Sequence, residues 1–304
     1  MSITITGGFT LAGGGWTVAP PPSSKAIFGY GTLDQSSNYS MTNLVSNTGV
    51  VGNDVTGVGS SRYALAAAGY GTDKAIFGYG YAGFATAVTN LVSNTGVVGN
   101  DVTGVGTARG ELAAAGYGTD KAIFGFGYGS NYTAITNLVS NTGVVATNTA
   151  GVGAARSYLG AAGYGSDKAI FGYGTANVTN LVTNTGVVGN DVGGVGTSRN
   201  KLAAAGYGTD KAIFGYGYTG SYVSITNLVG NTGVVSTDTT GVGTARSGLA
   251  AARYGVDTAL FGYGYNNSVL SITNLVSNTG VVATDTTGVG TARYSLAAAS
   301  YGYG

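Results

Sequence analysis

Residues 62–80 read RYALAAAGYGTDKAIFGYG, and residues 89–98 of the same stretch read TNLVSNTGVV. The phrase KAIFGYG begins at five positions and returns once as TALFGYG: Lys25, Lys74, Lys121, Lys168, Lys211 and Thr258. The steps between these positions are 49, 47, 47, 43 and 47 residues. A fixed period of this length indicates an array of supersecondary units that bury their apolar faces against one another.

Each unit carries strand and turn signals and no helical periodicity. The small-residue segment LAAAGYG and the apolar segment KAIFGYG both end in glycine. TNLV follows a loop, and Ser-Asn-Thr-Gly then leads to a pair of valines, which indicates a hairpin. We name these four expected strands a, b, c and d in chain order. Four short strands in about 40–50 residues are typical of a β-propeller blade.

The order of the strands predicts how the ring closes. The first complete unit starts with strand b at Lys25, and the chain ends on a lone strand a at 294–300. Pairing these two strands would complete a sixth blade and remove free edges. The sequence therefore predicts an all-β, six-bladed β-propeller over residues 25–304. A β-solenoid with two rungs per period is the alternative, disfavoured because the two halves of the unit do not resemble each other.

Few charges are available for chemistry. Charged residues make up 8% of the 304 residues, and the net charge is +1. The basic stripe of a nucleic-acid-binding protein is missing, and no apolar run approaches the roughly 18 residues of a membrane helix. Cysteine and histidine are absent, which removes disulfides, thiolate metal sites and the commonest general base. We therefore expect no cofactor, no metal, no nucleic-acid partner and no membrane insertion.

Most charged residues repeat with the unit. Six arginines share one repeat position: Arg62, Arg109, Arg156, Arg199, Arg246 and Arg293. Aspartates stand eight residues before five of them, with Asn148 at the sixth place: Asp54, Asp101, Asp191, Asp238 and Asp285. A ring of catalytic or ligand groups is one interpretation. We favour an arginine–aspartate clamp between strands or blades, because a site needs local asymmetry and these positions repeat.

The units differ mainly in two places. These are the b–c loops (32–41, 81–88, 128–135, 175–178, 218–225 and 265–272) and the pair of residues after each repeat arginine. In an up-down blade both lie on one face, which predicts a binding surface rich in Tyr, Ser, Gly and Asn. Its candidate residues are Asp34, Tyr39, Tyr63, Phe84, Glu111, Asn131, Tyr132, Tyr158, Lys201, Tyr222, Asn266, Asn267 and Tyr294. Neutral variation of exposed loops is the other explanation.

Residues 1–24 lie outside the repeat and contain no charge, all three prolines and the only tryptophan. Ser2–Thr6 alternates like a strand, and the prolines form a stiff spacer. We interpret this segment as an arm and linker that docks on a partner through Ile3, Ile5, Phe9 and Trp16. A strand folded back onto the chain's own propeller is the alternative.

The stretch RYALAAAGYGTDKAIFGYG with the later TNLVSNTGVV resembles a kelch-type propeller repeat. Gly-Tyr-Gly replaces the kelch double glycine, and valines stand where kelch repeats carry tryptophan. KAIFGYG and TNLVSNTGVVATDTTGVGTAR also resemble repeats in virion structural proteins of tailed phages, especially cyanophages and marine phages. The resemblance covers about residues 25–304. It implies a tail, fibre or capsid-surface component and transfers no catalytic residue.

The sequence therefore predicts a non-enzymatic phage structural protein. Residues 1–24 would bind other virion proteins, and the variable face would bind a host glycan or protein. We expect the protein to be located in the virion. The N-terminus lacks the pattern of a signal peptide, which agrees with assembly of the particle in the host cytoplasm and its release by lysis. A secreted or cell-surface lectin or adhesin is the alternative. A glycosidase is disfavoured, because the variable face offers only Asp34 and Glu111 as its carboxylates.

Overall fold

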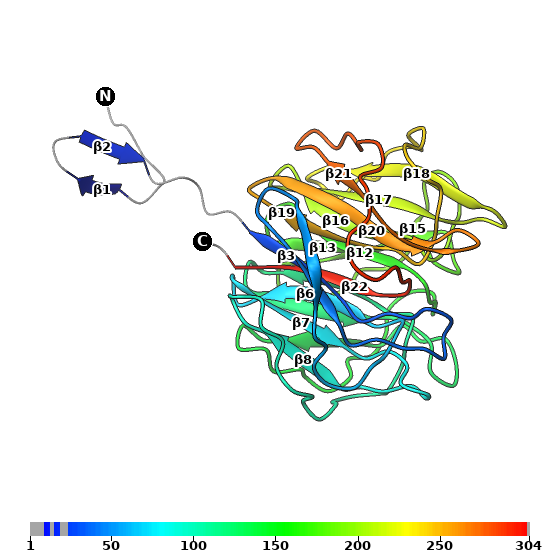
Figure 1. Ribbon diagram of the computed structural model, residues 1–304. Coiled ribbons are helices and arrows are strands. Elements are labelled where there is room, and N and C mark those ends of the chain that lie inside the picture. The colour runs from blue at the N-terminus through cyan, green and yellow to red at the C-terminus, as the bar shows by residue number, and fades with distance from the viewer. Residues whose placement is uncertain (1–8, 13–14, 19–23, 303–304) are drawn as a thin grey trace.

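The computed structural model describes residues 9–12, 15–18 and 24–302, and every regular element in these ranges is a β-strand. The strands between residues 25 and 301 form six small antiparallel sheets of three or four strands each. Figure 1 shows these sheets grouped around a common centre, with the late strand β22 lying beside the early strand β3. The all-β class predicted from the sequence is therefore confirmed.

The sheets repeat one strand order. Their first strands are β6 (Ala66–Tyr70), β9 (Ala113–Tyr117), β12 (Gly160–Tyr164), β16 (Ala203–Tyr207), β19 (Ala250–Tyr254) and β22 (Ala297–Tyr301). Their second strands are β3 (Lys25–Gly29), β7 (Lys74–Gly78), β10 (Lys121–Gly125), β13 (Lys168–Gly172), β17 (Lys211–Tyr218) and β20 (Thr258–Tyr265). Their third strands are β4 (Thr42–Val45), β8 (Thr89–Val92), β11 (Thr136–Val139), β14 (Val178–Val182), β18 (Tyr222–Val229) and β21 (Val269–Val276). Two sheets carry a fourth strand, β5 (Val51–Val55) or β15 (Val192–Gly193).

The second strand of each sheet is buried on both faces, which explains its apolar sequence. In β7, Ala75, Ile76 and Phe77 are fully buried. The last residue of this strand, Gly78, has to be glycine, because a Cβ placed there would lie 2.8 Å from a ring carbon of Phe124 in the next sheet. The Phe–Gly pair of the repeat therefore sets the close approach of neighbouring sheets, and each hydrophobic core lies between two sheets.

One sheet contains both ends of the repeat array. Strand β22 pairs with β3 in the register Ala297↔Gly29, Ala299↔Ile27 and Tyr301↔Lys25. The order in this sheet is β22-β3-β4-β5, so its first strand comes from the far end of the chain. The pairing of a C-terminal strand a with the N-terminal strand b is the one expected from the sequence.

Neighbouring sheets are linked by two sets of backbone hydrogen bonds. Each first strand contacts the next in the order β6, β9, β12, β16, β19, β22 and again β6. At the start of these strands an N–H donates to the carbonyl of the preceding unit: Ala64 to Ser295, Glu111 to Ala64, Tyr158 to Glu111, Lys201 to Tyr158, Gly248 to Lys201 and Ser295 to Gly248. At the other end the donors and acceptors are Gly71 to Asp120, Gly118 to Asp167, Gly165 to Asp210, Gly208 to Asp257, Gly255 to Ser24 and Gly302 to Asp73. This arrangement is compatible with a β-propeller.

The expected strand d is mostly missing as a regular strand. Among the described residues, four of the six sheets have only three strands. In the second sheet, isolated bridges Thr89↔Val102 and Val92↔Val98 stand where the fourth strand was expected. Residues 99–101 face the third strand through side-chain contacts, because the Asn90 amide donates to the Gly99 carbonyl and to Asp101. The valine pair indicated a strand; Val98 is buried in a core and bridges Val92, whereas Val97 is 65% exposed.

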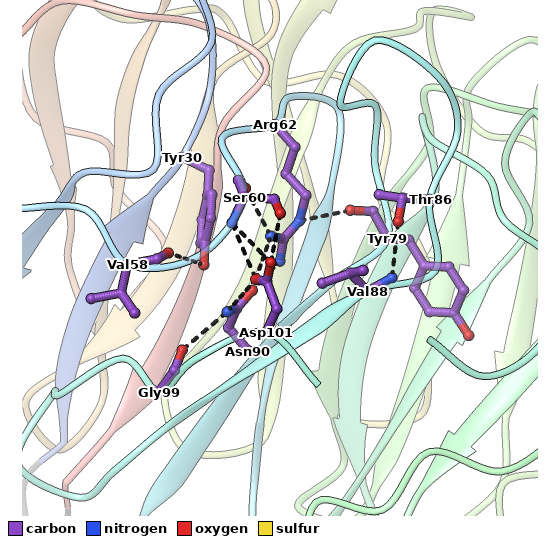
Figure 2. Close-up of polar contacts among 10 residues, drawn as sticks. All are labelled: Tyr30, Val58, Ser60, Arg62, Tyr79, Thr86, Val88, Asn90, Gly99 and Asp101. Atoms are coloured by element: carbon purple, nitrogen blue, oxygen red, sulfur yellow. Dashed lines mark hydrogen bonds and ion pairs between the residues drawn. The ribbon is translucent and has the colours of Figure 1, made fainter. Parts of the chain in front are cut away.

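The repeat arginines lie at the junctions between sheets. Figure 2 shows Arg62 donating from Nε to the Tyr79 carbonyl at 3.0 Å and from a terminal nitrogen to Asn90 Oδ1 at 2.5 Å. Its guanidinium carbon lies 4.3 Å from the ring centroid of Tyr30, which belongs to the preceding sheet. Burial raises the pKa of Tyr30 to about 12, so its hydroxyl stays neutral and donates to the Val58 carbonyl. The arginine thus stacks on one sheet and donates hydrogen bonds to the next.

Four repeat arginines form an ion pair with an aspartate that is not the one eight residues before them. Arg62 lies 3.9 Å from Asp101, and Arg293 lies 4.0 Å from Asp54. Asp101 also accepts hydrogen bonds from the Ser60 backbone and hydroxyl. The sequence analysis expected an arginine–aspartate clamp between strands or blades, and these ion pairs join consecutive units.

The pKa values of these aspartates predict how the stability of the fold depends on pH in acid. Burial disfavours the charged form of Asp101, but hydrogen bonds from Ser60 and Asn90 and the charge of Arg62 outweigh it, so its pKa is lowered. The pKa of Asp54, Asp238 and Asp285 is lowered in the same way. An aspartate whose pKa is lower in the folded state stabilises the fold at pH values above 3.8, its pKa in the unfolded chain. This stabilisation is lost as the pH falls through the folded-state pKa.

We expect the free energy of unfolding, measured with urea, to fall as pH is lowered from about 4 to about 2. The dependence should be shallower in the Asp101→Asn variant, for which Asn148 in the third unit is a natural precedent. An equal slope in both proteins would contradict the assignment.

The described part of the N-terminal segment is a hairpin. β1 (Phe9–Ala12) and β2 (Gly15–Val18) pair antiparallel, with Leu11 opposite Trp16. Neither strand pairs with a described strand of the six sheets, and Figure 1 draws the hairpin apart from them. Ile3 and Ile5 of the expected alternating strand lie outside the described residues, whereas Phe9 and Trp16 fall in β1 and β2.

Candidate functional site

The structure brings the two variable segments of the sequence together. In the second sheet Tyr63, directly after the repeat arginine, bridges Tyr81 at the start of the b–c loop. The same bridge joins Gly110 to Tyr128, and Tyr294 joins Thr32 in the sheet that holds both ends of the array. We call these loops and the pairs that follow the arginines the variable surface. In these units the loop and the pair lie side by side, which is the arrangement expected for an up-down blade.

Tyrosine rings form clusters on the variable surface. Four rings follow one another across three neighbouring sheets, with centroid distances of 5.3 Å from Tyr218 to Tyr222, 6.1 Å to Tyr265 and 5.1 Å to Tyr294. We call this set the tyrosine row. Tyr222 and Tyr294 were candidates from the sequence, whereas Tyr218 and Tyr265 were missed because most units carry tyrosine at that position. The signal that could have found them is their position as the first residue of a variable loop.

Two smaller aromatic groups complete this part of the surface. The ring centroids of Tyr63 and Tyr81 lie 5.5 Å apart. The Tyr81 hydroxyl donates to the Tyr128 carbonyl at 2.9 Å. Tyr128 in turn lies 5.2 Å from Tyr132. Phe84 is 76% exposed and Tyr132 is 52% exposed, so both offer apolar area to a partner.

The residues that begin the first strands form a collar around a cavity of about 70 Å³. Its six members are Ala64, Glu111, Tyr158, Lys201, Gly248 and Ser295, and all have left-handed backbones with φ between 51° and 62°. Only glycine adopts this conformation without strain, which costs other residues roughly 1–3 kcal/mol. Five units nevertheless carry a side chain here. Strain of this kind clusters at functional sites, which makes the collar a candidate site.

The collar is asymmetric. Burial raises the pKa of Tyr158, and the polar interaction with the Glu111 carboxylate and its negative charge raise it further. The Lys201 ammonium lies 4.9 Å from the centroid of the same ring. Three consecutive units therefore place an acid, a phenol and a base beside one another. The opposite side of the collar holds only the small residues Gly248, Ser295 and Ala64.

Glu111 also joins the collar to the aromatic groups. Burial raises the pKa of Tyr63 and of Tyr81, and the charge of Glu111 is the next largest cause in both. Among the described groups, this carboxylate therefore acts on tyrosines of the second and fourth sheets. A carboxylate acceptor on a surface that also carries phenol groups is suited to hydroxyl-rich ligands.

The other candidates from the sequence have simpler surroundings. Asp34 accepts hydrogen bonds from Ser36 and Ser37 in its own exposed loop, which lowers its pKa to about 2. Its carboxylate therefore shapes that loop, and no described contact links it to Glu111. The Tyr39 carbonyl accepts from the Arg62 backbone. The remaining three lie in b–c loops: Asn131, Asn266 and Asn267.

The described residues include no group of three or more acidic side chains that could hold a metal ion. No helix in the described ranges is long and apolar enough to cross a membrane. In comparisons with known proteins, no family model and no curated protein matches this chain.

Proposed function

We propose that this chain is a non-enzymatic virion structural protein of tailed-phage type. In this proposal the six sheets are the blades of a closed, kelch-like β-propeller, and residues 1–24 dock it on the particle. The variable surface binds a host glycan or protein. The observation that carries the proposal is the separation of a repeated framework from unrepeated side chains that meet on one surface.

Closure of the propeller is supported by the links between neighbouring sheets. Two sets of six backbone hydrogen bonds pass from unit to unit and return to the first. The pairing of β22 with β3 joins residues from both ends of the array. Each junction also contains an arginine that stacks on one sheet and donates hydrogen bonds to the next. Arg293, for example, stacks on the Tyr263 ring and donates to the Tyr30 carbonyl. A closed ring protects all but its outer edges, which suits a particle component exposed to solvent.

The chemistry of the variable surface supports recognition of hydroxyl-rich or peptide ligands. The tyrosine row offers ring faces and hydroxyl groups, and the collar adds Glu111 and Lys201. Tyrosine provides rigid, amphipathic contact area at low entropic cost. A nucleic-acid site would need a basic patch, whereas these two charges have opposite signs.

Removing two rings of the tyrosine row is expected to weaken ligand binding at least about tenfold, or about 1.4 kcal/mol. The variant is Tyr222→Ala with Tyr294→Ala, tested on a glycan array and by binding to host cells. The matched control is Val234→Ser, a 68% exposed residue in the turn after β18 and outside the variable surface. Equal binding by the double variant and the control would refute this surface as the site.

Location on the particle tests the virion assignment. Immunogold electron microscopy of an infected culture and its purified particles is expected to place gold at one fixed position on phage particles. A chain that lacks residues 1–24 is expected to fold and to be absent from particles. Gold on cell envelopes with bare particles would favour the lectin or adhesin alternative. Incorporation of the shortened chain would refute docking through residues 1–24.

A further inference from the structure

The first strands of the six sheets surround a second cavity, of about 220 Å³, away from the collar. In β6 the half-buried residues Ala67 and Gly69 line it, between neighbours that are buried in the cores. The corresponding positions in the other strands are also small, with one exception. We call this space the axial cavity.

The exception is Arg253 in β19. It takes the place of Gly69 and of its counterparts Gly116, Gly163 and Gly206, and Ser300 has this position in β22. Because alternate residues of a strand share a face, Arg253 extends on the same side as Ala251, into the axial cavity. The only large side chain at these wall positions is therefore a cation.

Arg253 differs from the repeat arginines in its contacts. Arg246 of the same unit donates three hydrogen bonds, to the Tyr263 and Thr244 carbonyls and to Asn274. By contrast, the Nε of Arg253 is buried and has no hydrogen-bond partner among the described residues. An unpaired buried donor on a permanent cation is costly, and such a group is normally paired. An acceptor that enters the cavity would supply this missing partner.

The other charges at the axial cavity are also positive. Lys74, Lys121, Lys168 and Lys211 line it, and no carboxylate is among its described lining residues. Each of these lysines forms an ion pair with the aspartate before it, with distances from 2.9 to 3.7 Å. Their charges are thus locally balanced, and Arg253 is the cation that a ligand would satisfy. In the sixth unit Thr258 replaces the lysine. This unit therefore lacks the lysine that is paired with an aspartate elsewhere, and it carries the unpaired Arg253 instead.

The lining also offers small polar groups. Thr72, Thr119, Ser166 and Thr209 contribute to it, and together with the lysines they place hydrogen-bonding groups on several sides. A guanidinium presents donors in a planar fork that matches two oxygens of an oxyanion. A volume of about 220 Å³ is many times the roughly 10–15 Å³ that one water molecule needs in a cavity, so the space admits a small anion with waters.

We propose that the axial cavity is a binding site for a phosphate group, held by the guanidinium of Arg253. Phosphate is favoured over a single carboxylate because its oxygens can be reached from several walls of the cavity at once. The group can arrive as inorganic phosphate or as the phosphate of a small monoester. This site is separate from the collar and from the tyrosine row, so it does not depend on the function proposed for the variable surface.

The test compares the full chain with its Arg253→Gly variant, which introduces the residue that four other first strands carry. Binding of inorganic phosphate is measured by isothermal titration calorimetry and by the shift in melting temperature, at constant ionic strength. The unaltered chain is expected to bind phosphate and to melt at a higher temperature in its presence. The variant should bind at least about tenfold more weakly and should be no less stable in phosphate-free buffer.

The charge-matched control is Lys201→Ala, which also removes one positive charge but lies in the collar. It is expected to bind phosphate as the unaltered chain does. A second arm replaces inorganic phosphate with a sugar phosphate, and a third uses acetate. Tighter binding of the sugar phosphate would identify a monoester as the ligand. Equal phosphate binding by Arg253→Gly, no binding by the unaltered chain, or tighter binding of acetate would each overturn the proposal.

Discussion

Removal of residues 294–304 is expected to abolish the cooperative unfolding transition of this protein. These residues include β22, which gives β3 its backbone partner over five register pairs. They also supply Leu296 and Tyr301, which are 5% and 2% exposed in the cores. Burial of two such side chains contributes about 3–6 kcal/mol, before the lost pairing is counted. A typical domain is stable by only about 5–15 kcal/mol.

Urea unfolding followed by circular dichroism and by tyrosine fluorescence measures this effect. Addition of a synthetic peptide of residues 294–304 is expected to restore the transition, because the peptide can occupy the position of β22. The control is a chain without residues 1–22, which should unfold as the full chain does. A cooperative transition in the truncated chain within about 1 kcal/mol of the full-length value would show that β22 is dispensable.

Arg62→Ala is expected to destabilise the fold by about 3–5 kcal/mol, the range observed when one member of a buried charged network is removed. The guanidinium is fully buried, and its loss leaves the Tyr79 carbonyl and Asn90 Oδ1 without their donors. It also removes the stacking on Tyr30, which links two sheets. The readout is the free energy of unfolding from urea titration at neutral pH.

Two further variants separate the geometry of Arg62 from its charge. Arg62→Lys keeps the charge but cannot donate in a planar fork, so we expect it to retain most of the loss. Arg253→Ala removes an arginine that lacks the repeat network, and it should leave stability nearly unchanged or improve it. A loss below about 1 kcal/mol for Arg62→Ala would place the junction's stability in the apolar contacts instead.

Much of the strand arrangement follows from the repeat. The small residues of β6 and the apolar run of β7 have one pattern in every unit, and their burial agrees with the positions expected for strands a and b. The fourth strand was predicted less well. Its valines suggested a ladder, yet the stretch from Val97 to Asp101 combines isolated backbone bonds, such as Gly99 N–H to the Leu91 carbonyl, with side-chain bonds from Asn90. Such bonds depend on which strand lies alongside, and sequence spacing does not reveal this.

The network around the repeat arginines shows the same limit. The sequence predicted an arginine–aspartate clamp between strands or blades, but it did not identify which aspartate lies beside which arginine. The structure pairs Arg62 with Asp101 and also uses Asn90 and Tyr30, which the sequence analysis did not single out. In a repeat, every spacing is equally periodic, so periodicity cannot tell whether a partner lies in the same unit or in the next.

The candidate site was predicted as a surface and not as an arrangement of side chains. Variation between units indicated Glu111, Tyr158 and Lys201 one by one. Their contact depends on the backbone bonds of the collar, which bring the second residue after each arginine next to its counterpart in neighbouring units. Arg253 interrupts the small residues that the other units carry at its position, but only the position of β19 shows that it extends into the axial cavity.

The pairing of β22 with β3 also has a consequence for biosynthesis. Arg293 donates to the Tyr30 carbonyl across 263 residues of chain, so the first sheet stays incomplete while the ribosome makes everything in between. At about 5–20 residues per second, β3 would wait for roughly 13–53 s with one edge unpaired. During this interval the nascent chain can pair with a neighbour on the same polysome. Chaperone occupancy at β3 would then rise until the last strand leaves the exit tunnel.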